Sequence, residues 1–152
     1  MFEFKYDLPV SEFFLASQEA LGEHWEQVAG FKDKIKLNPD QAKYELLKDA
    51  GVLRSISIVD DGKIVGYSVL LISPHLHYAE TVFAMVDVIF LCESHRKTRA
   101  GLFLINKTEE FAKEAGAHVL TYHTKPNHNT IEKILYYKGF GHMENIIGKY
   151  VG

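Results

Sequence analysis

The segment from Val82 to Ala115 constrains the fold of this chain more than any other. It begins with Val82–Leu91, which is apolar except for one aspartate and rich in β-branched residues. An apolar run of this length predicts a strand that is covered on both faces. A polar and basic loop, Cys92–Arg99, follows, and a helix is expected from Ala100 to about Ala115. A strand, a basic loop and a helix are therefore expected at the centre of the fold.

A strand that leads through a basic loop into a helix is a common way to hold a phosphate. The first turn of a helix leaves backbone N–H groups unpaired, and the helix dipole favours anions at that end. Arg96, Lys97 and Arg99 add positive charge, and Gly101 lets a ligand approach the backbone closely. The alternative is a surface connection that happens to be basic.

Length and composition predict one globular domain, residues 1–152. Hydrophobic residues make up 47% of the chain, enough for a real core. No apolar run reaches the roughly 20 residues that a membrane-spanning helix needs. The N-terminus lacks the pattern of a secretion signal, and the single cysteine, Cys92, excludes an internal disulfide. These features predict a cytoplasmic protein that does not bind membranes.

The net charge of −3 makes the basic loop a local feature of a slightly acidic protein. Strong nucleic-acid binding usually needs a basic surface, so it is not expected here.

The first third of the chain predicts an edge strand and two helices. Alternation over Met1–Tyr6 indicates the strand. The first helix is expected to start near Pro9 with Ser11 as its cap, and to end near Gly22 or continue to Gly30. The second helix is expected to follow Asn38–Asp40, with Asn38 as its cap and Pro39 in its first turn, and to stop at Gly51.

A hairpin is expected in the middle of the chain. Val52–Val59 and Ile64–Ile72 read as strands, and the Asp61-Gly62 dipeptide between them favours a tight turn. Ser73–Tyr78 is expected to be the loop before the central strand.

The remaining elements are a strand at His118–His123, a helix at Asn127–Lys138 and a last strand at Ile146–Val151. Together these elements predict an α+β domain with a mixed, mostly antiparallel sheet flanked by helices, in the order β-α-α-β-β-β-α-β-α-β.

This order and two motifs resemble the GNAT superfamily of acyl-CoA-dependent N-acyltransferases. The family's pyrophosphate signature, Gln/Arg-x-x-Gly-x-Gly/Ala, corresponds to Arg96–Gly101, in which Arg99 replaces the middle glycine. The family's C-terminal pattern corresponds to Asn127–Ile131, which contains His128, and to Tyr136–Phe140. The similarity in element order extends over nearly the whole chain.

The resemblance implies a V-shaped splay after the central strand, in which acetyl-CoA binds as co-substrate without a metal. Backbone groups of Phe90, Leu91 and Cys92 would pair with the pantetheine arm. The phosphates would be held by the cradle Arg96, Lys97, Thr98, Arg99, Ala100, Gly101 and Leu102. Asn127 is the remaining implied cofactor-binding residue. Arg99 either narrows this cradle, with an unfavourable φ angle, or points outward to pair with the phosphates of CoA. A degenerate cofactor site is the alternative.

Transfer of an acyl group to an amine needs a base for the amine and an acid for the departing thiolate. Asp87 is the only carboxylate in the central strand and is the first candidate for the base; otherwise it is a strand-end aspartate bonded to a neighbour. His123 is the second candidate. The family's usual acid position falls on Leu135, so its neighbour Tyr136 is the candidate acid, unless it simply packs against the sheet.

Other polar residues suggest weaker hypotheses. His75 and His77 with Glu80 lack the fixed third ligand of a metal site, so a substrate-side loop is favoured over a metal. Cys92 lacks an evident base partner and is interpreted as a packing residue. Acceptor-side candidates are found in the first helical region: Glu23, His24, Trp25 and Glu26.

The resemblance therefore implies an N-acetyltransferase that transfers the acetyl group directly, in a ternary complex, to a small-molecule or peptide amine. A GNAT-fold module that has lost catalysis is the second hypothesis, supported by Arg99 and Leu135. Action on an amine linked to protein or nucleic acid is a third. A homodimer is compatible with the sequence.

Overall fold

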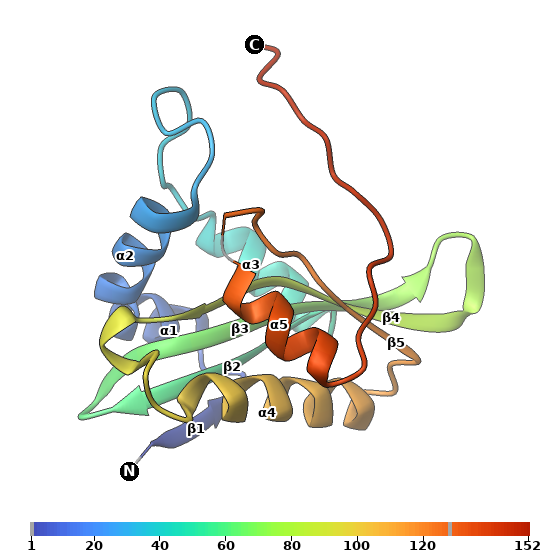
Figure 1. The fold of residues 1–152 in the computed structure, drawn as a ribbon, viewed down its shortest axis with the longest axis horizontal. Helices are drawn as coiled ribbons and strands as arrows, with labels where there is room; N and C mark the ends of the chain where they lie inside the picture. Colours follow the sequence, from blue (N-terminus) through green and yellow to red (C-terminus); the bar gives the residue numbers. More distant parts are fainter. Residues whose placement is uncertain (1, 128) are drawn as a thin grey trace.

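The computed structural model, described for residues 2–127 and 129–152, contains one five-stranded sheet in the order β1-β2-β3-β4-β5 (Figure 1). The first four strands pair antiparallel, and β5 joins β4 in parallel. The strands are β1 (Glu3–Tyr6), β2 (Leu53–Asp60), β3 (Lys63–His75), β4 (Tyr78–Leu91) and β5 (Val119–Tyr122). The mixed, mostly antiparallel α+β architecture expected from the sequence is confirmed.

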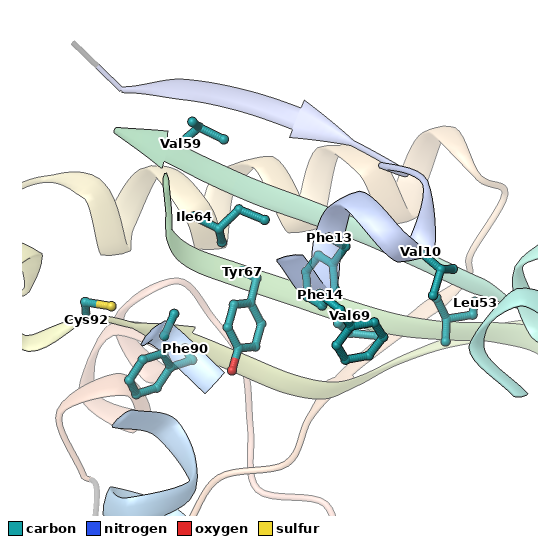
Figure 2. Close-up of a cluster of buried hydrophobic side chains, with 11 residues drawn as sticks. Val10, Phe13, Phe14, Leu53, Val59, Ile64, Tyr67, Val69, Phe90 and Cys92 are labelled. Atoms are coloured by element: carbon teal, nitrogen blue, oxygen red, sulfur yellow. The ribbon is translucent and has the colours of Figure 1, made fainter. Parts of the chain in front are cut away.

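Helices cover both faces of the sheet, and each face has its own apolar core. On one face, the first three helices pack over Tyr67, Val69 and Phe90, as Figure 2 shows. On the other face, α4 packs over Ile56, Ile58 and Leu70. The helices are α1 (Val10–Ala16), α2 (Gln18–Val28), α3 (Gln41–Asp49), α4 (Ala100–Glu114) and α5 (Asn129–Tyr137), with a 3-10 turn, η1, at Glu93–His95.

Strand β4 is irregular at Asp87. Leu70 of β3 lies opposite Val86 whereas Val69 lies opposite Val88, so Asp87 is the extra residue of a β-bulge. The parallel pairing with β5 covers Phe83–Val86 and goes no further along β4. The final residues of β4 therefore leave β5 at the bulge, which is the splay that the family resemblance implies.

The expected helix starts need correction. Ser11 lies inside α1, which begins after Pro9 without a side-chain cap, and the first helical region breaks at Ser17 into α1 and α2. The second predicted helix is capped by Asp40 rather than Asn38, because the Asp40 carboxylate accepts a 3.0 Å hydrogen bond from the Lys43 N–H. Near both helix starts, residues of similar capping ability lie close together in the sequence. Which of them caps the helix depends on where the folded backbone turns into the helix.

The Asp61-Gly62 turn is confirmed, with φ angles of +49° and +76°. The expected loop Ser73–Tyr78 is mostly strand, because β3 and β4 extend until His75 pairs with Tyr78. The predicted last strand, Ile146–Val151, is wrong: this segment forms no strand in the described chain, and it projects from the body of the fold (Figure 1). A strand pattern alone does not supply the partner that a strand needs. No helix in the described residues is long and apolar enough to cross a membrane.

Candidate active site

A cavity of about 370 Å³ occupies the splay beyond the bulge. Its lining comes from five separate parts of the chain, and the end of β4 provides Ile89, Phe90 and Leu91. The remaining lining residues are Val28 of α2, Arg96 of the loop before α4, Gly101, Leu104 and Ile105 of α4, and Asn127, Thr130, Ile131 and Ile134 in and before α5. Five predicted cofactor residues thus meet in one place: Phe90, Leu91, Arg96, Gly101 and Asn127.

Backbone groups at the end of β4 alternate between the neighbouring strand and the cavity. The Cys92 N–H donates to the Val65 carbonyl at 2.9 Å, and its own carbonyl accepts from the His95 N–H at 2.9 Å. Both backbone groups of Cys92 are therefore hydrogen-bonded within the chain, and its N–H is not available to the pantetheine arm as expected. Because hydrogen bonds alternate along a strand, Ile89 and Leu91 direct their backbone groups toward the splay, and Phe90 directs its backbone groups toward β3.

Several backbone N–H groups of the loop before α4 are hydrogen-bonded within the loop itself. Arg96 and Thr98 donate their N–H groups to Glu93 and His95, and the Ala100 N–H donates to Thr98 Oγ1 at 3.1 Å. The N–H groups at the first turn of α4, from Arg99, Gly101 and Leu102, have no acceptor within residues 2–127 and 129–152. Those three groups are therefore available to an anion.

Arg96 lies at the edge of the cavity and contacts both the end of β4 and α2. Its Nε donates to the Leu91 carbonyl at 2.8 Å, and its guanidinium lies 5.3 Å from the centre of the Phe90 ring. The same guanidinium hydrogen-bonds Gln27 and lies 4.0 Å from the Glu23 carboxylate, both on α2. Arg96 thereby connects the loop, the end of β4 and the second helix.

Arg99 adopts ordinary helical backbone angles, with φ −76° and ψ −3°, at the start of α4. Its side chain is exposed. The replacement of glycine at this position therefore requires no unfavourable φ angle. A Cβ placed on Gly101 would meet Leu91 Cδ2 at 3.5 Å, an ordinary contact, so a much larger side chain is needed to obstruct the cavity there.

A family model described as the acetyltransferase (GNAT) family matches residues 15–142. This chain belongs to the GNAT acetyltransferase family. The match includes the cavity, the basic loop and α5. No curated protein matches the chain.

Solved structures share the GNAT fold over the full chain at low sequence identity. An aminoglycoside acetyltransferase from an uncultured soil metagenomic sample has a TM-score of 0.73 and 17% identity, covering 100% of this chain and 98% of that one. A transcriptional regulator from Bacillus halodurans C-125 has a TM-score of 0.78 and 16% identity, covering 99% and 100%. AAC(6')-Iy in complex with the bisubstrate analogue CoA-S-monomethyl-acetylneamine has a TM-score of 0.69 and 17% identity, covering 100% and 99%. At these identities the likeness concerns the fold.

Within this GNAT domain, Asp87 lies on the bulge with an exposed side chain. Its charge contributes to the raised pKa of Tyr44 on α3, for which burial is the larger cause. Asp87 therefore faces the side of the sheet covered by the first three helices. No sequence pattern indicated Tyr44, because only the fold brings α3 close to the bulge.

A second polar connection reaches the cavity from the same side. The His24 ring on α2 stacks on Phe90 with ring centres 4.6 Å apart, and its Nδ1 lies 2.6 Å from the hydroxyl of Tyr67. His24 was expected near an acceptor site, whereas Tyr67 was missed because it lies in the middle of an apolar strand. Cys92 is close by, and burial together with the Glu23 carboxylate raises its pKa to about 11, so its thiol stays protonated at neutral pH.

Tyr136 and His123 lie in a different place from Asp87. Both line a second cavity of about 600 Å³ between β5, α5 and residues 140–146, and neither lines the first cavity. Helix α5 separates the two cavities, because Ile131 and Ile134 face the first whereas Leu135 and Tyr136 face the second. The structure therefore does not bring the three predicted catalytic residues together around one cavity.

The histidines of the long β3–β4 hairpin form an aromatic group. His75 stacks on Tyr78 with ring centres 4.8 Å apart, and it also contacts Phe83. Within the described part of the chain, no group of three or more His, Cys, Asp or Glu side chains is arranged to hold a metal. His128, part of the C-terminal motif, lies outside the described residues.

Proposed function

We propose that this chain is a cytoplasmic N-acetyltransferase that moves an acetyl group from acetyl-CoA to a primary amine by direct transfer in a ternary complex. The observation that supports this most is the cavity in the splay, which combines strand backbone, apolar walls and a basic helix start. Family membership and the CoA-linked ligand of AAC(6')-Iy support the same co-substrate.

In this proposal, the backbone of Ile89 and Leu91 pairs with the amide-rich arm of CoA. The free N–H groups at the start of α4 and the charges of Arg96, Lys97 and Arg99 bind its phosphates. Thr98 and Ala100 shape the loop through their mutual hydrogen bond, and Asn127 lines the far side of the cavity. Arg96 exchanges the carboxamide of Gln27 for a phosphate when the co-substrate binds.

Asp87 is the proposed base that receives the proton of the attacking amine, directly or through water. Its exposed position on the bulge gives it access to solvent and to an acceptor on the side of α2 and α3. Tyr136 as the acid and His123 as a second base remain predictions. The acceptor is proposed to be a small-molecule or peptide amine, the class to which the aminoglycosides of the structural relatives belong.

A second candidate is a GNAT module that binds CoA or a partner without catalysis. It is favoured by the position of Tyr136 on the face of α5 opposite the first cavity, and by the buried Leu135 at the usual acid position. The transcriptional regulator among the structural relatives is consistent with a role of this kind.

Calorimetric titration with acetyl-CoA and with CoA tests the site, and thiol release that depends on an added amine tests the activity. Gly101→Trp should fill the cavity and abolish binding. Gly22→Trp is the matched control, because nothing lies within 4 Å of a Cβ at this exposed helix position. Equal affinity in the two variants would disprove the site. Binding without amine-dependent thiol release for a broad set of amines would favour the non-catalytic module.

A further inference from the structure

The end of β2 and the loop before α4 meet at one histidine. His95 belongs to η1, and Asp60 is the last residue of β2. The Nε2 atom of His95 lies 3.0 Å from Asp60 Oδ2, and its Nδ1 atom lies 2.7 Å from Ser94 Oγ. Its ring also meets the ring of Phe2, with ring centres 5.8 Å apart. The His95 side chain is only 18% exposed, although it belongs to a surface loop, so the ring is held from three sides.

These contacts assign the hydrogen bonds of the neutral His95 ring. A carboxylate can only accept, so Nε2 carries the proton and donates to Asp60, while Nδ1 accepts from the Ser94 hydroxyl. Both ring nitrogens are satisfied, and the partners of a histidine fix its tautomer and its orientation. Ser94 lines neither cavity, which favours a role in holding the ring over that of a nucleophile.

The backbone of the same histidine supports the start of α4. The His95 carbonyl accepts two hydrogen bonds from Thr98, at 3.1 Å from its N–H and at 2.6 Å from its hydroxyl. The Thr98 hydroxyl oxygen in turn accepts from the N–H of Ala100, the first residue of α4, at 3.1 Å. The N–H groups that are available to an anion lie on both sides of Ala100. Their direction therefore depends on where His95 is held.

We propose that Asp60 and His95 are positioning residues for the phosphates of the co-substrate. Asp60 holds the His95 ring, the His95 carbonyl holds Thr98, and Thr98 orients the first N–H groups of α4 before the ligand arrives. Preorganisation of this kind raises affinity because the ligand does not have to order the loop. The inference rests on the proposed acetyl-CoA site and names two residues that control its phosphate end.

The position of the pair predicts a selective effect. Neither Asp60 nor His95 lines the first cavity, so both act on the ligand only through the loop. Pantetheine is the part of CoA that carries no phosphate, and its binding should not depend on either residue. CoA binding should depend on both.

Calorimetric titration with CoA tests this series of contacts. Asp60→Ala should raise the dissociation constant of CoA about tenfold, because it removes a hydrogen bond to a charged group on which the loop depends. Asp60→Asn should bind CoA as the native chain does, since a carboxamide oxygen accepts the same bond from His95. Glu19→Ala is the matched control, because it removes an exposed carboxylate that lies 2.8 Å from Lys63 Nζ of the same hairpin.

Pantetheine separates positioning from a general loss of structure. NMR titration, which measures weak binding, should give the same pantetheine affinity for the native chain, Asp60→Ala and Glu19→Ala. His95→Phe keeps a ring beside Phe2 and should weaken CoA binding as Asp60→Ala does. The double variant Asp60→Ala/His95→Phe should bind no more weakly than either single variant, because the two residues act in one series.

Equal CoA affinity in Asp60→Ala and Glu19→Ala would overturn the inference, as would an equal loss of affinity for CoA and for pantetheine. If Asp60→Asn bound CoA as weakly as Asp60→Ala, the charge of Asp60 and not its hydrogen bond would matter, and positioning would be excluded. A native chain that does not bind CoA would overturn the proposed function, and this inference with it. Native binding that Asp60→Ala leaves unchanged would overturn this inference alone.

Discussion

The hydroxyl of Tyr67 on β3 lies 2.6 Å from Nδ1 of His24 on α2. Tyr67 is almost completely buried, and this burial, more than any neighbouring charge, raises the pKa of its hydroxyl above the ordinary value. The hydroxyl therefore stays protonated and donates to Nδ1 whenever His24 is neutral with its proton on Nε2. Since the His24 ring also stacks on Phe90, this bond fixes α2 against a wall of the cavity.

Tyr67→Phe should lower the free energy of unfolding by about 1 kcal/mol, the usual contribution of one hydrogen bond. It should also weaken acetyl-CoA binding slightly, because Phe90 loses the support of a fixed His24. Urea unfolding and calorimetry measure the two effects. Tyr137→Phe is the control, since Tyr137 is 92% exposed. Equal stability of the two variants would contradict a structural role for the bond.

Arg96→Ala should weaken acetyl-CoA binding by about tenfold or more, because it removes a charge-assisted contact from the cavity edge. Arg99→Gly restores the residue of the family signature, but it should also reduce affinity rather than raise it. The backbone of Arg99 is already unstrained, so the substitution removes only positive charge. Higher affinity in Arg99→Gly would show that the arginine obstructs the cradle.

Asp87→Asn should lower the rate of acetyl transfer at least about tenfold and remove the acid limb of its pH dependence, as loss of a general base requires. The pH profile of kcat/KM is the measurement. Asp49→Asn, at the exposed end of α3, serves as the control. An unchanged acid limb would exclude Asp87 as the base.

Tyr136→Phe should lower kcat and shift the basic limb of the pH profile if Tyr136 protonates the thiolate. The adjacent Tyr137→Phe should have no effect, because that side chain points to solvent. Identical kinetics for the two variants would assign Tyr136 to the wall of the second cavity alone.

The Cys92 thiol should react slowly with iodoacetamide at pH 7 and faster as the pH approaches its raised pKa of about 11. Because the folded pKa is higher than the unfolded one, the folded state retains its proton longer as the pH rises. Stability linked to Cys92 is therefore complete below about pH 9 and is lost as the pH rises toward 11. Comparison of the unfolding free energies of the native protein and Cys92→Ala across this range measures the effect. Parallel pH curves would contradict it.

Local chemistry explains which parts of the fold could be predicted. The Asp61-Gly62 turn and the strand-loop-helix at β4 and α4 depend on neighbours in sequence, and they were placed correctly. Val28 and Ile134 became cavity walls only because three distant helices converge on the splay, so no local pattern indicated them. The prediction of a strand at Ile146–Val151 was wrong for the opposite reason. The local pattern is that of a strand, but a strand forms only where a partner strand is present.

The same limit applies to the candidate site. Phe90, Leu91, Arg96, Gly101 and Asn127 were found through motifs of fixed spacing, and they share one cavity. The offset from Gly139 points to Leu135, and Tyr136 was chosen as its neighbour, but a helix turns by about 100° per residue. Its neighbour Leu135 is buried and Tyr136 itself lines the second cavity, so spacing alone could not tell which cavity each would face.

The single extra residue in β4 shifts the alternation of side chains between the two faces of the sheet. Before Asp87, the even-numbered Ala84 and Val86 pack toward α4; after it, the odd-numbered Ile89 and Leu91 do, while Val88 and Phe90 turn to the opposite core. A regular strand through Asp87 would instead place Val88 and Phe90 on the α4 side with Val86, and Phe90 would leave His24 and the acceptor side. Deleting Asp87 would let Val88 follow Val86 in regular alternation, so Phe90 would keep its side of the sheet and only the bulge would be lost.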